Sequence, residues 1–298
     1  MNNTKLFTDY LSKVSKVVNK SLKDFLPKSN NMISKTMRYA VLNGGKRLRP
    51  ALVILSAELF GGKTENIMPA ACALEYMHSY SLVHDDLPAM DNDDLRRGKP
   101  TVHKKFGYAA AILCGDALLT ESFNLITCAK AKEQNINSAV KILSKEGGYQ
   151  GMIDGQFEDT LETDRWNNKD KKSLSKKLKH IQIQKTGALI KAALKIGAVL
   201  AGANKKNIEN LEVYGENIGC AFQITDDILD AYGNKKLLGK KGSDSDNNKL
   251  TALSLYGKQE AQKQAQSHIV EAKKALHSFG KKAEILESLA DFILERAY

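Results

Sequence analysis

Two clusters of aspartates stand out in the sequence because each lies in or beside an apolar helical pattern. The first is SLVHDDLPAMDNDDLRRGKP (residues 81–100), in which the aspartates give way directly to basic residues, and the second is QITDDILD (residues 223–230). Carboxylates that converge in a largely apolar protein repel one another and lose hydration, and a bound cation relieves both costs. Oxygen ligands without His or Cys suit Mg²⁺, which bridges a few carboxylates to substrate phosphates.

Basic residues lie close to the first cluster. Arg96 and Arg97 follow it directly, and the separate stretch GGKRLRP (residues 44–50) supplies Lys46 and Arg49. Such side chains offer charge-assisted donors to phosphate oxygens. We therefore predict that the aspartates bind metal, and that the metal and the basic residues together bind a diphosphate. A solvated, acid-rich helix end would explain one such cluster, but it explains two clusters on separate apolar helices poorly.

The second cluster lies in a helical pattern that runs from about residue 211 to residue 232. On this helix Gly215, Gly219, Gln223, Asp226 and Asp230 form one row. Two glycines inside a helix cost about 1 kcal/mol each, and a solvated face more often carries Lys, Glu and Gln. We therefore expect something large to lie against this row.

The first cluster cannot form one continuous, ideal helix. Pro88 removes a backbone donor and drives Leu87 away from the α region. Asp91 lies six residues after Asp85, which is about 240° around an ideal helix. A bulge or loop at residues 87–88 must therefore intervene if Asp85 and Asp91 are to share a ligand.

Two further polar residues lie on helical rows of interest. Lys185 shares an otherwise apolar row, so we expect its ammonium group to point inward, with snorkelling to the rim as the alternative. His78 shares the row of Asp85, although a hydrogen-bonded core histidine is the alternative reading there.

Composition and periodicity predict an all-α fold. With 298 residues, of which 42% are hydrophobic, the chain can bury a sizeable core. Apolar residues recur at helical spacing almost everywhere, and we find no convincing period-2 strand bounded by turn residues. Polar excursions occur at residues 161–173 and 232–249, and neither resembles a flexible linker. Residues 1–298 are therefore expected to form a single domain.

The formal net charge of +11 is compatible with a nucleic acid, an anionic membrane or a phosphorylated small molecule as partner, and equally with no such partner. The four cysteines are widely separated and mostly flanked by apolar residues, as expected for small core residues in a reduced compartment. The N-terminus lacks the apolar core of a signal peptide, and no run approaches a membrane span in length. We predict a cytoplasmic protein without a membrane span.

Several stretches, taken in order and spacing, resemble the short-chain trans-isoprenyl diphosphate synthases, most closely the bacterial farnesyl diphosphate synthases. The matching stretches are GGKRLRP (44–50), HSYSLVHDDLPAMDNDDLRRGKPTVHKKFG (78–107), GDALLT (115–120), GQFED (155–159), KTGALI (185–190) and FQITDDILD (222–230). Together they cover most of the chain.

The resemblance implies a single polyprenyl synthase domain with the isoprenoid synthase fold, in which antiparallel helices surround a deep central cavity. It also implies a homodimer and a prenyltransferase reaction. Isopentenyl diphosphate would be joined head-to-tail to dimethylallyl and then geranyl diphosphate, giving (2E,6E)-farnesyl diphosphate and free diphosphate. The reaction would pass through an allylic carbocation formed with the help of three Mg²⁺ ions, for which Mn²⁺ could substitute.

The resemblance also assigns roles by position. The two aspartate motifs would face each other across the cavity mouth and hold the metal ions on the allylic diphosphate. The implied metal ligands are Asp85, Asp86, Asp91, Asp226, Asp227 and Asp230. Arg96 and Lys240 would contact the allylic diphosphate. Isopentenyl diphosphate would be held by Lys46, Arg49, His78 and Arg97. The groups beside the carbocation and the departing diphosphate would be Lys185, Thr186 and Gln223.

Product length depends on the floor of the tail pocket. By resemblance, the residues five and four before the first aspartate line that floor, and here they are Tyr80 and Ser81. The aromatic ring of Tyr80, together with the two-residue insertion that gives DDLPAMD, resembles the pattern of enzymes that make a C15 product. The nearest alternative is a geranylgeranyl or geranyl diphosphate synthase, and a more remote one is a basic protein that binds nucleic acid or a membrane surface.

Three positions depart from the expected family pattern. Ala252 stands where a tyrosine is usual, the chain ends ERAY without the usual terminal basic residue, and GQFED places Phe157 and Glu158 in a normally more apolar GQxxD. These departures concern loop closure and substrate handling. They leave the expected metal and diphosphate ligands in place.

Overall fold

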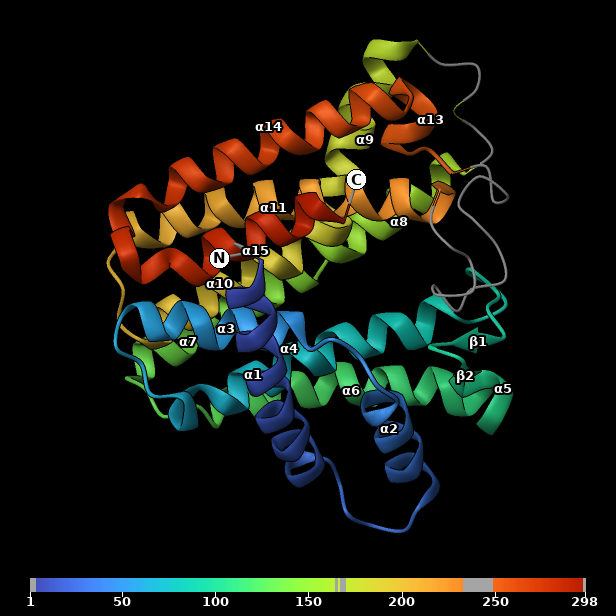
Figure 1. The fold of residues 1–298 in the computed structure, drawn as a ribbon. Coiled ribbons are helices and arrows are strands. Elements are labelled where there is room, and N and C mark those ends of the chain that lie inside the picture. The colour runs from blue at the N-terminus through green and yellow to red at the C-terminus, as the bar shows by residue number, and fades with distance from the viewer. Residues whose placement is uncertain (1–3, 164–165, 167–169, 233–248, 297–298) are drawn as a thin grey trace. The chain divides into compact units, whose positions relative to one another are not determined.

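The computed structural model describes residues 4–163, 166, 170–232 and 249–296, and these residues are almost entirely helical (Figure 1). The chain forms two compact units. The N-terminal unit comprises Leu11–Lys141 and Ile196–Gly202, and the C-terminal unit comprises Met1–Tyr10, Ile142–Lys195 and Ala203–Tyr298. The all-α prediction is confirmed. The predictions of a single domain and of a deep central cavity remain predictions.

The N-terminal unit is built around α4 (Thr64–Asp85), which carries the first aspartate motif at its end. Helices α2 (Met32–Leu42), α3 (Leu48–Leu59) and α6 (Tyr108–Thr127) pack against it. Most of α4 between Ile67 and Val83 is buried, so apolar residues surround this helix on nearly every side. Its end is therefore held firmly by the core.

A short antiparallel ribbon and further helices complete the elements of this unit. The elements are α1 (Lys5–Phe25), β1 (Leu95–Arg96), β2 (Lys99–Pro100), α5 (Val102–Phe106) and the start of α7 (Glu133–Gly147). The sequence patterns did not predict the ribbon, because strands of two residues are too short to show a period. It lies within the first motif.

Helix α6 corrects one expectation from the sequence. It is long and apolar enough to cross a membrane by length and composition alone, although no such run was expected. Its side chains at Ala111, Cys114, Leu118 and Ile126 are fully buried, and the helix packs against α4. Only 39% of its most apolar window is buried and Leu113 is 59% exposed, so α6 is a core helix along one face.

The C-terminal unit is organised along α11 (Lys205–Tyr232), which carries the second aspartate motif. Helices α14 (Lys258–Leu276) and α15 (Glu284–Glu295) pack along α11, and α14 runs beside it in Figure 1. The other elements are α8 (Met152–Glu162), α9 (Lys171–Ile181), the π-helix η1 (Gln182–Gly187), α10 (Ala188–Leu200), α13 (Ala252–Tyr256) and the 3₁₀ segment η2 (His277–Ala283).

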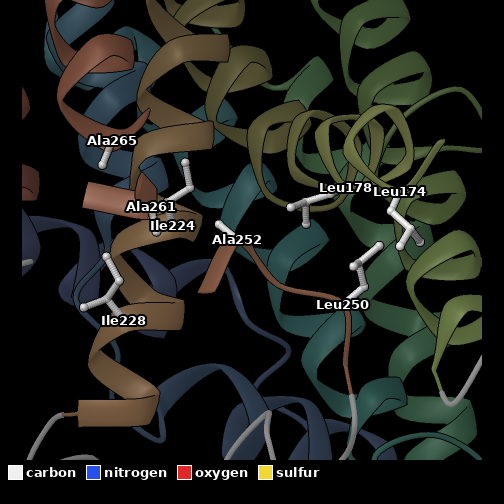
Figure 2. Close-up of a cluster of buried hydrophobic side chains, with 8 residues drawn as sticks. All are labelled: Leu174, Leu178, Ile224, Ile228, Leu250, Ala252, Ala261 and Ala265. Atoms are coloured by element: carbon white, nitrogen blue, oxygen red, sulfur yellow. The ribbon is translucent and has the colours of Figure 1, made fainter. Parts of the chain in front are cut away.

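A cluster of buried apolar side chains supports the end of α11 (Figure 2). It draws residues from α9, α11, α13, α14 and the segment just before α13. Its members are Leu174, Leu178, Ile224, Ile228, Leu250, Ala252, Ala261 and Ala265. Because Ile224 and Ile228 lie on either side of the second aspartate pair in sequence, this cluster fixes the rotation of α11 at the motif.

The glycine row on α11 lies against backbone. A Cβ atom on Gly219 would come within 2.4 Å of the Cα atom of Gly187, and one on Gly215 within 3.0 Å of the Cα atom of Lys191. The large neighbour expected from the sequence is therefore the main chain of η1 and α10. Glycine lets these helices approach closely enough for short side chains to meet across them.

We predict that Gly219→Ala lowers the free energy of unfolding by about 1–3 kcal/mol, because backbone must move to admit the methyl group. Gly187→Ala is the matched control, since its Cβ atom would meet nothing closer than 3.4 Å. Urea titrations followed by circular dichroism measure both. Equal stability of the two variants would contradict the close-approach argument.

Candidate active site

The first aspartate motif turns back on itself where α4 ends. The backbone N–H of Asp91 donates to the carbonyl oxygen of Asp85 at 2.9 Å, and the N–H of Asn92 donates to that of Leu87 at 3.1 Å. Asn92 has a positive φ of 54°, a conformation that asparagine tolerates better than most residues. The turn required by the sequence argument is present, and it brings Asp91 beside Asp85.

Asp86 lies in a different environment from Asp85 and Asp91. It is only 3% exposed, and one of its carboxylate oxygens lies 2.6 Å from both Nε and Nη2 of Arg96. Burial raises the pKa of Asp86, and the bond from Arg96 partly offsets that rise. Asp91 is exposed and Asp85 partly exposed. Of the three aspartates predicted to bind metal here, Asp85 and Asp91 are therefore accessible, whereas Asp86 is buried against Arg96.

The ribbon β1–β2 carries the two arginines of the motif. Arg97 and Gly98 both have positive φ, as a two-residue type I′ hairpin turn requires. Beyond the ribbon, the hydroxyl of Thr101 donates to the carbonyl of Asp93 at 2.9 Å, and its N–H donates to that of Asp94 at 3.0 Å. The ribbon is thus closed at its base, and the two arginines have fixed backbone positions.

Arg97 reaches back to the loop between α2 and α3. Its Nη1 donates to the carbonyl oxygen of Gly44. A Cβ atom on Gly45 would lie within 3.0 Å of the guanidinium, so only glycine leaves room for this contact. The GGKRLRP stretch and the Arg-Arg pair, far apart in sequence, therefore meet in the N-terminal unit.

Arg49 and His78 lie in the same basic cluster. Nη1 of Arg49 and Nε2 of His78 are 3.2 Å apart. Burial, and next the nearby charges of Arg49 and Arg97, lower the pKa of His78 well below its usual value. The imidazole is therefore neutral at pH 7, and its Nε2 accepts the bond from Arg49. Lys46 is exposed on the connecting loop.

The two residues assigned to product length lie on α4, before Asp85. Tyr80 is 5% exposed, and its ring packs edge-on against that of His84 at 5.8 Å. Burial, reinforced by the charge of Asp85, raises the pKa of Tyr80 to about 12. Ser81 donates to the carbonyl of His78 within the helix. Tyr80 is thus the bulky, neutral side chain at this level of α4.

In the C-terminal unit the π-helix η1 positions Lys185 and Thr186. Nζ of Lys185 donates to a carboxylate oxygen of Asp159 at 2.7 Å, and Asp159 on α8 is only 8% exposed. A single π turn commonly marks a functional position in a helix. The inward orientation expected for Lys185 is observed. Asp159, which lies within GQFED, is a site residue that the sequence analysis did not single out.

A chain of hydrogen bonds connects η1 to α11. The hydroxyl of Thr186 lies 2.5 Å from Oε1 of Gln223, and Nε2 of Gln223 donates to Asp227 at 2.8 Å. The other carboxylate oxygen of Asp227 accepts from the backbone N–H of Ala252 at 3.3 Å. Because Ala252 contributes its main chain here, the missing tyrosine side chain does not affect this contact.

Asp226 and Asp230 are the more accessible carboxylates of the second motif, since both are partly exposed whereas Asp227 is buried. Nη2 of Arg296 donates to Asp226 at 2.9 Å, and its guanidinium lies 5.2 Å from the ring centroid of Phe222. Arg296 was not among the predicted site residues, although it lies in the ERAY stretch.

A polar pocket with a cavity volume of about 60 Å³ lies beside Lys185, Gln223 and Asp227 within the C-terminal unit. Its polar lining comes from Asp159, Gln182, Lys185, Gln223, Asp227, Lys249 and Thr251. Lys240, assigned to the allylic diphosphate, lies outside the described residues. Along the described part of the chain, no three His, Cys, Asp or Glu side chains converge closely enough to hold a metal ion by themselves.

Known proteins are similar to this chain in sequence and in fold. The polyprenyl synthetase family model matches residues 30–289. A farnesyl diphosphate synthase of Escherichia coli is 41% identical, over 97% of this chain and 99% of its own length. A geranylgeranyl diphosphate synthase of Cyanophora paradoxa is 42% identical, over 96% and 95%.

A solved geranyltransferase from Helicobacter pylori, in complex with magnesium and isoprenyl diphosphate, superposes with a TM-score of 0.82 at 30% identity, covering 99% of this chain and 97% of that one. The resemblance inferred from the motifs is therefore confirmed over nearly the whole sequence. The chain belongs to the polyprenyl synthetase family and is a short-chain prenyl diphosphate synthase.

Proposed function

We propose that this enzyme condenses isopentenyl diphosphate with dimethylallyl and then geranyl diphosphate to give (2E,6E)-farnesyl diphosphate, releasing one diphosphate at each step. The observation that carries the proposal is the pairing, inside one unit, of the Asp85–Asp91 turn with the basic cluster of Arg49, His78 and Arg97. An accessible acidic pair suits a metal-bound diphosphate, and an adjacent basic cluster suits a second diphosphate.

The residues present fit Mg²⁺ as the cofactor. Asp85 and Asp91 on one turn, and Asp226 and Asp230 one helical turn apart on α11, offer only oxygen ligands. Since no three described carboxylates converge, each ion would take its remaining ligands from water and substrate phosphate, as Mg²⁺ commonly does. Bound Mg²⁺ neutralises charge that develops on a leaving diphosphate.

The basic side chains of the N-terminal unit bind the diphosphate groups. Most of them bind isopentenyl diphosphate, whose diphosphate is kept in the product. Lys46, Arg49 and Arg97 supply fixed positive charge for the diphosphate of isopentenyl diphosphate. His78 is neutral, so its Nδ1–H can donate a hydrogen bond while Nε2 accepts from Arg49. Arg96, anchored on Asp86, supplies positive charge for the allylic diphosphate.

The side chains of the C-terminal unit act on the carbocation and on the departing diphosphate. The Thr186 hydroxyl donates its hydrogen bond to Oε1 of Gln223, so the lone pairs of the hydroxyl oxygen are available to stabilise positive charge on the allyl group. Lys185, held by Asp159, provides a fixed cation for the departing diphosphate. The allylic C–O bond breaks, the double bond of isopentenyl diphosphate attacks the allylic cation, and the departing diphosphate takes a proton from the resulting carbocation, which leaves the new double bond of the product.

The direct test is to incubate the purified protein with labelled isopentenyl diphosphate, Mg²⁺ and each of the C5, C10 and C15 allylic diphosphates, and to size the products by chromatography. We expect C15 from the C5 and C10 primers and little extension of the C15 primer. A dominant C20 product would instead assign a geranylgeranyl diphosphate synthase. Salt-sensitive DNA binding without Mg²⁺-dependent turnover would refute the enzymatic proposal.

We predict that Asp85→Ala and Asp226→Ala each lower kcat by about a hundredfold or more, because each removes a ligand for the metal that neutralises the leaving group. Asp94→Ala is the matched control from the same motif: Asp94 is exposed and pairs with Lys104 at 2.8 Å, and we expect less than about a threefold loss. Steady-state rates with geranyl diphosphate measure all three. Turnover near that of the parent enzyme in either test variant would refute the ligand assignment.

Product length is proposed to depend on Tyr80, which lies five residues, or about 7.5 Å along the helix, before Asp85. Tyr80→Ala should deepen the tail pocket and shift product toward C20. Tyr80→Phe keeps the ring, and since the Tyr80 hydroxyl has no hydrogen-bond partner within the described residues, it should keep the C15 product. Identical chromatographic profiles for the two variants would rule out the role.

We also propose that a second copy of the chain covers α8, giving a homodimer. Four apolar side chains at four-residue spacing lie exposed along this helix and its approach: Tyr149 (78%), Ile153 (45%), Phe157 (61%) and Leu161 (37%). A contiguous row of this kind marks an interaction surface. The cytoplasmic location stays a prediction from the sequence.

Phe157→Glu should shift the protein toward monomer in sedimentation velocity, because it places a charge in the centre of this row. Val270→Glu on α14 is the control, since Val270 is also exposed (42%) but lies outside the row. A monomeric parent protein, or a dimer unaffected by Phe157→Glu, would contradict the assignment of this surface.

A further inference from the structure

Arg47, in the middle of GGKRLRP, is a buried charged residue that the proposed mechanism does not use. It is only 3% exposed, whereas Lys46 is exposed and Arg49 partly exposed. Its φ of 55° places a non-glycine residue in the left-handed region, a conformation that costs on the order of 1 kcal/mol or more. Such a conformation persists only where its surroundings impose it.

Three hydrogen-bond partners, from three helices, hold Arg47 in this left-handed conformation. Nε donates to Oδ1 of Asn19 on α1 at 2.8 Å, and Nη2 donates to the carbonyl oxygen of Val41 on α2 at 2.7 Å. Nη1 donates to the carboxylate of Glu75 on α4, which is itself only 2% exposed. Every nitrogen of the guanidinium is therefore engaged, and its planar fork sets the direction of each bond.

The loop between α2 and α3, which contains Arg47, is held at two further points. At its start, the carbonyl of Gly44 accepts from Arg97. At its end, Arg49 contacts His78, which lies three residues after Glu75 and thus on the same side of α4. Arg47 and Arg49 consequently contact the same side of α4. Lys46 lies between Gly44 and Arg47, which are both held by hydrogen bonds.

We propose that Arg47 is a positioning residue for the isopentenyl diphosphate subsite: its buried, three-way hydrogen bonding sets the backbone from which Lys46 and Arg49 reach the diphosphate. This inference rests on the proposed function of that subsite. It differs from a stability role, because a buried ion pair commonly stabilises a fold no better than well-packed apolar residues do.

The decisive variant is the double change Arg47→Met with Glu75→Met, which replaces both charges by apolar side chains of similar length. We expect it to fold, with a somewhat lower free energy of unfolding than the parent, because the ion pair is replaced by apolar contacts but Asn19 and the Val41 carbonyl lose their donor. We expect its KM for isopentenyl diphosphate to rise about tenfold or more, because displaced binding groups lose affinity steeply. The KM for geranyl diphosphate should change less than about twofold.

Two further variants keep the test decisive if the double variant does not fold. Arg47→Lys retains the charge beside Glu75 but loses the fork, and it should also raise the KM for isopentenyl diphosphate selectively. Tyr214→Phe in the C-terminal unit is the stability control, since it removes one buried bond to the carbonyl of Leu286. It should lower the unfolding free energy and leave both KM values unchanged.

A measurement independent of turnover is calorimetric titration with inorganic diphosphate, which should bind about tenfold more weakly to the Arg47 variants than to the parent. Absence of prenyl transfer by the parent protein would refute the proposed function. Normal transfer by the parent, with an unchanged KM for isopentenyl diphosphate in the Arg47 variants, would overturn this inference alone. An equal rise of both KM values would also overturn it, because it would indicate a general loss of structure.

Discussion

In both aspartate doublets the second carboxylate is buried and hydrogen-bonded within its own unit. Asp86 accepts from Arg96, and Asp227 accepts from Gln223 and from the backbone of Ala252. A buried carboxylate must be satisfied in this way, because an uncompensated one would cost several kcal/mol. In each doublet one aspartate is therefore bonded to its neighbours in the core, and the other is partly exposed.

The contacts of the C-terminal unit also require that the backbone of η1 lies close to that of α11. Thr186 and Gln223 meet because Gly219 lets η1 lie directly against α11. The π turn places Lys185 toward Asp159 in the same segment. The close packing of η1 against α11 and the hydrogen bond between Thr186 and Gln223 thus depend on the same contact, which explains why glycines unfavourable to an isolated helix occur in α11.

The helices, the order of the motifs and the turn after α4 were predictable from the sequence, because helical periodicity and the effect of Pro88 are local properties. The burial of Asp86 and Asp227 was not, since rotation about a helix axis depends on packing partners distant in sequence. For the same reason, sequence patterns did not indicate the roles of Asp159, Arg47 and Arg296. Each acts through a partner at least 26 residues away, and no local pattern marks such a pair.

The neutral state of His78 has a consequence for how the basic cluster responds to its surroundings. With the imidazole uncharged at pH 7, the positive charge of the cluster comes from Lys46, Arg49 and Arg97. A phosphate group has its second pKa near 6, so a diphosphate bound as proposed would itself titrate between about pH 5 and pH 8. Ionic strength would then govern the affinity of the cluster for that ligand more than the protonation of His78 does.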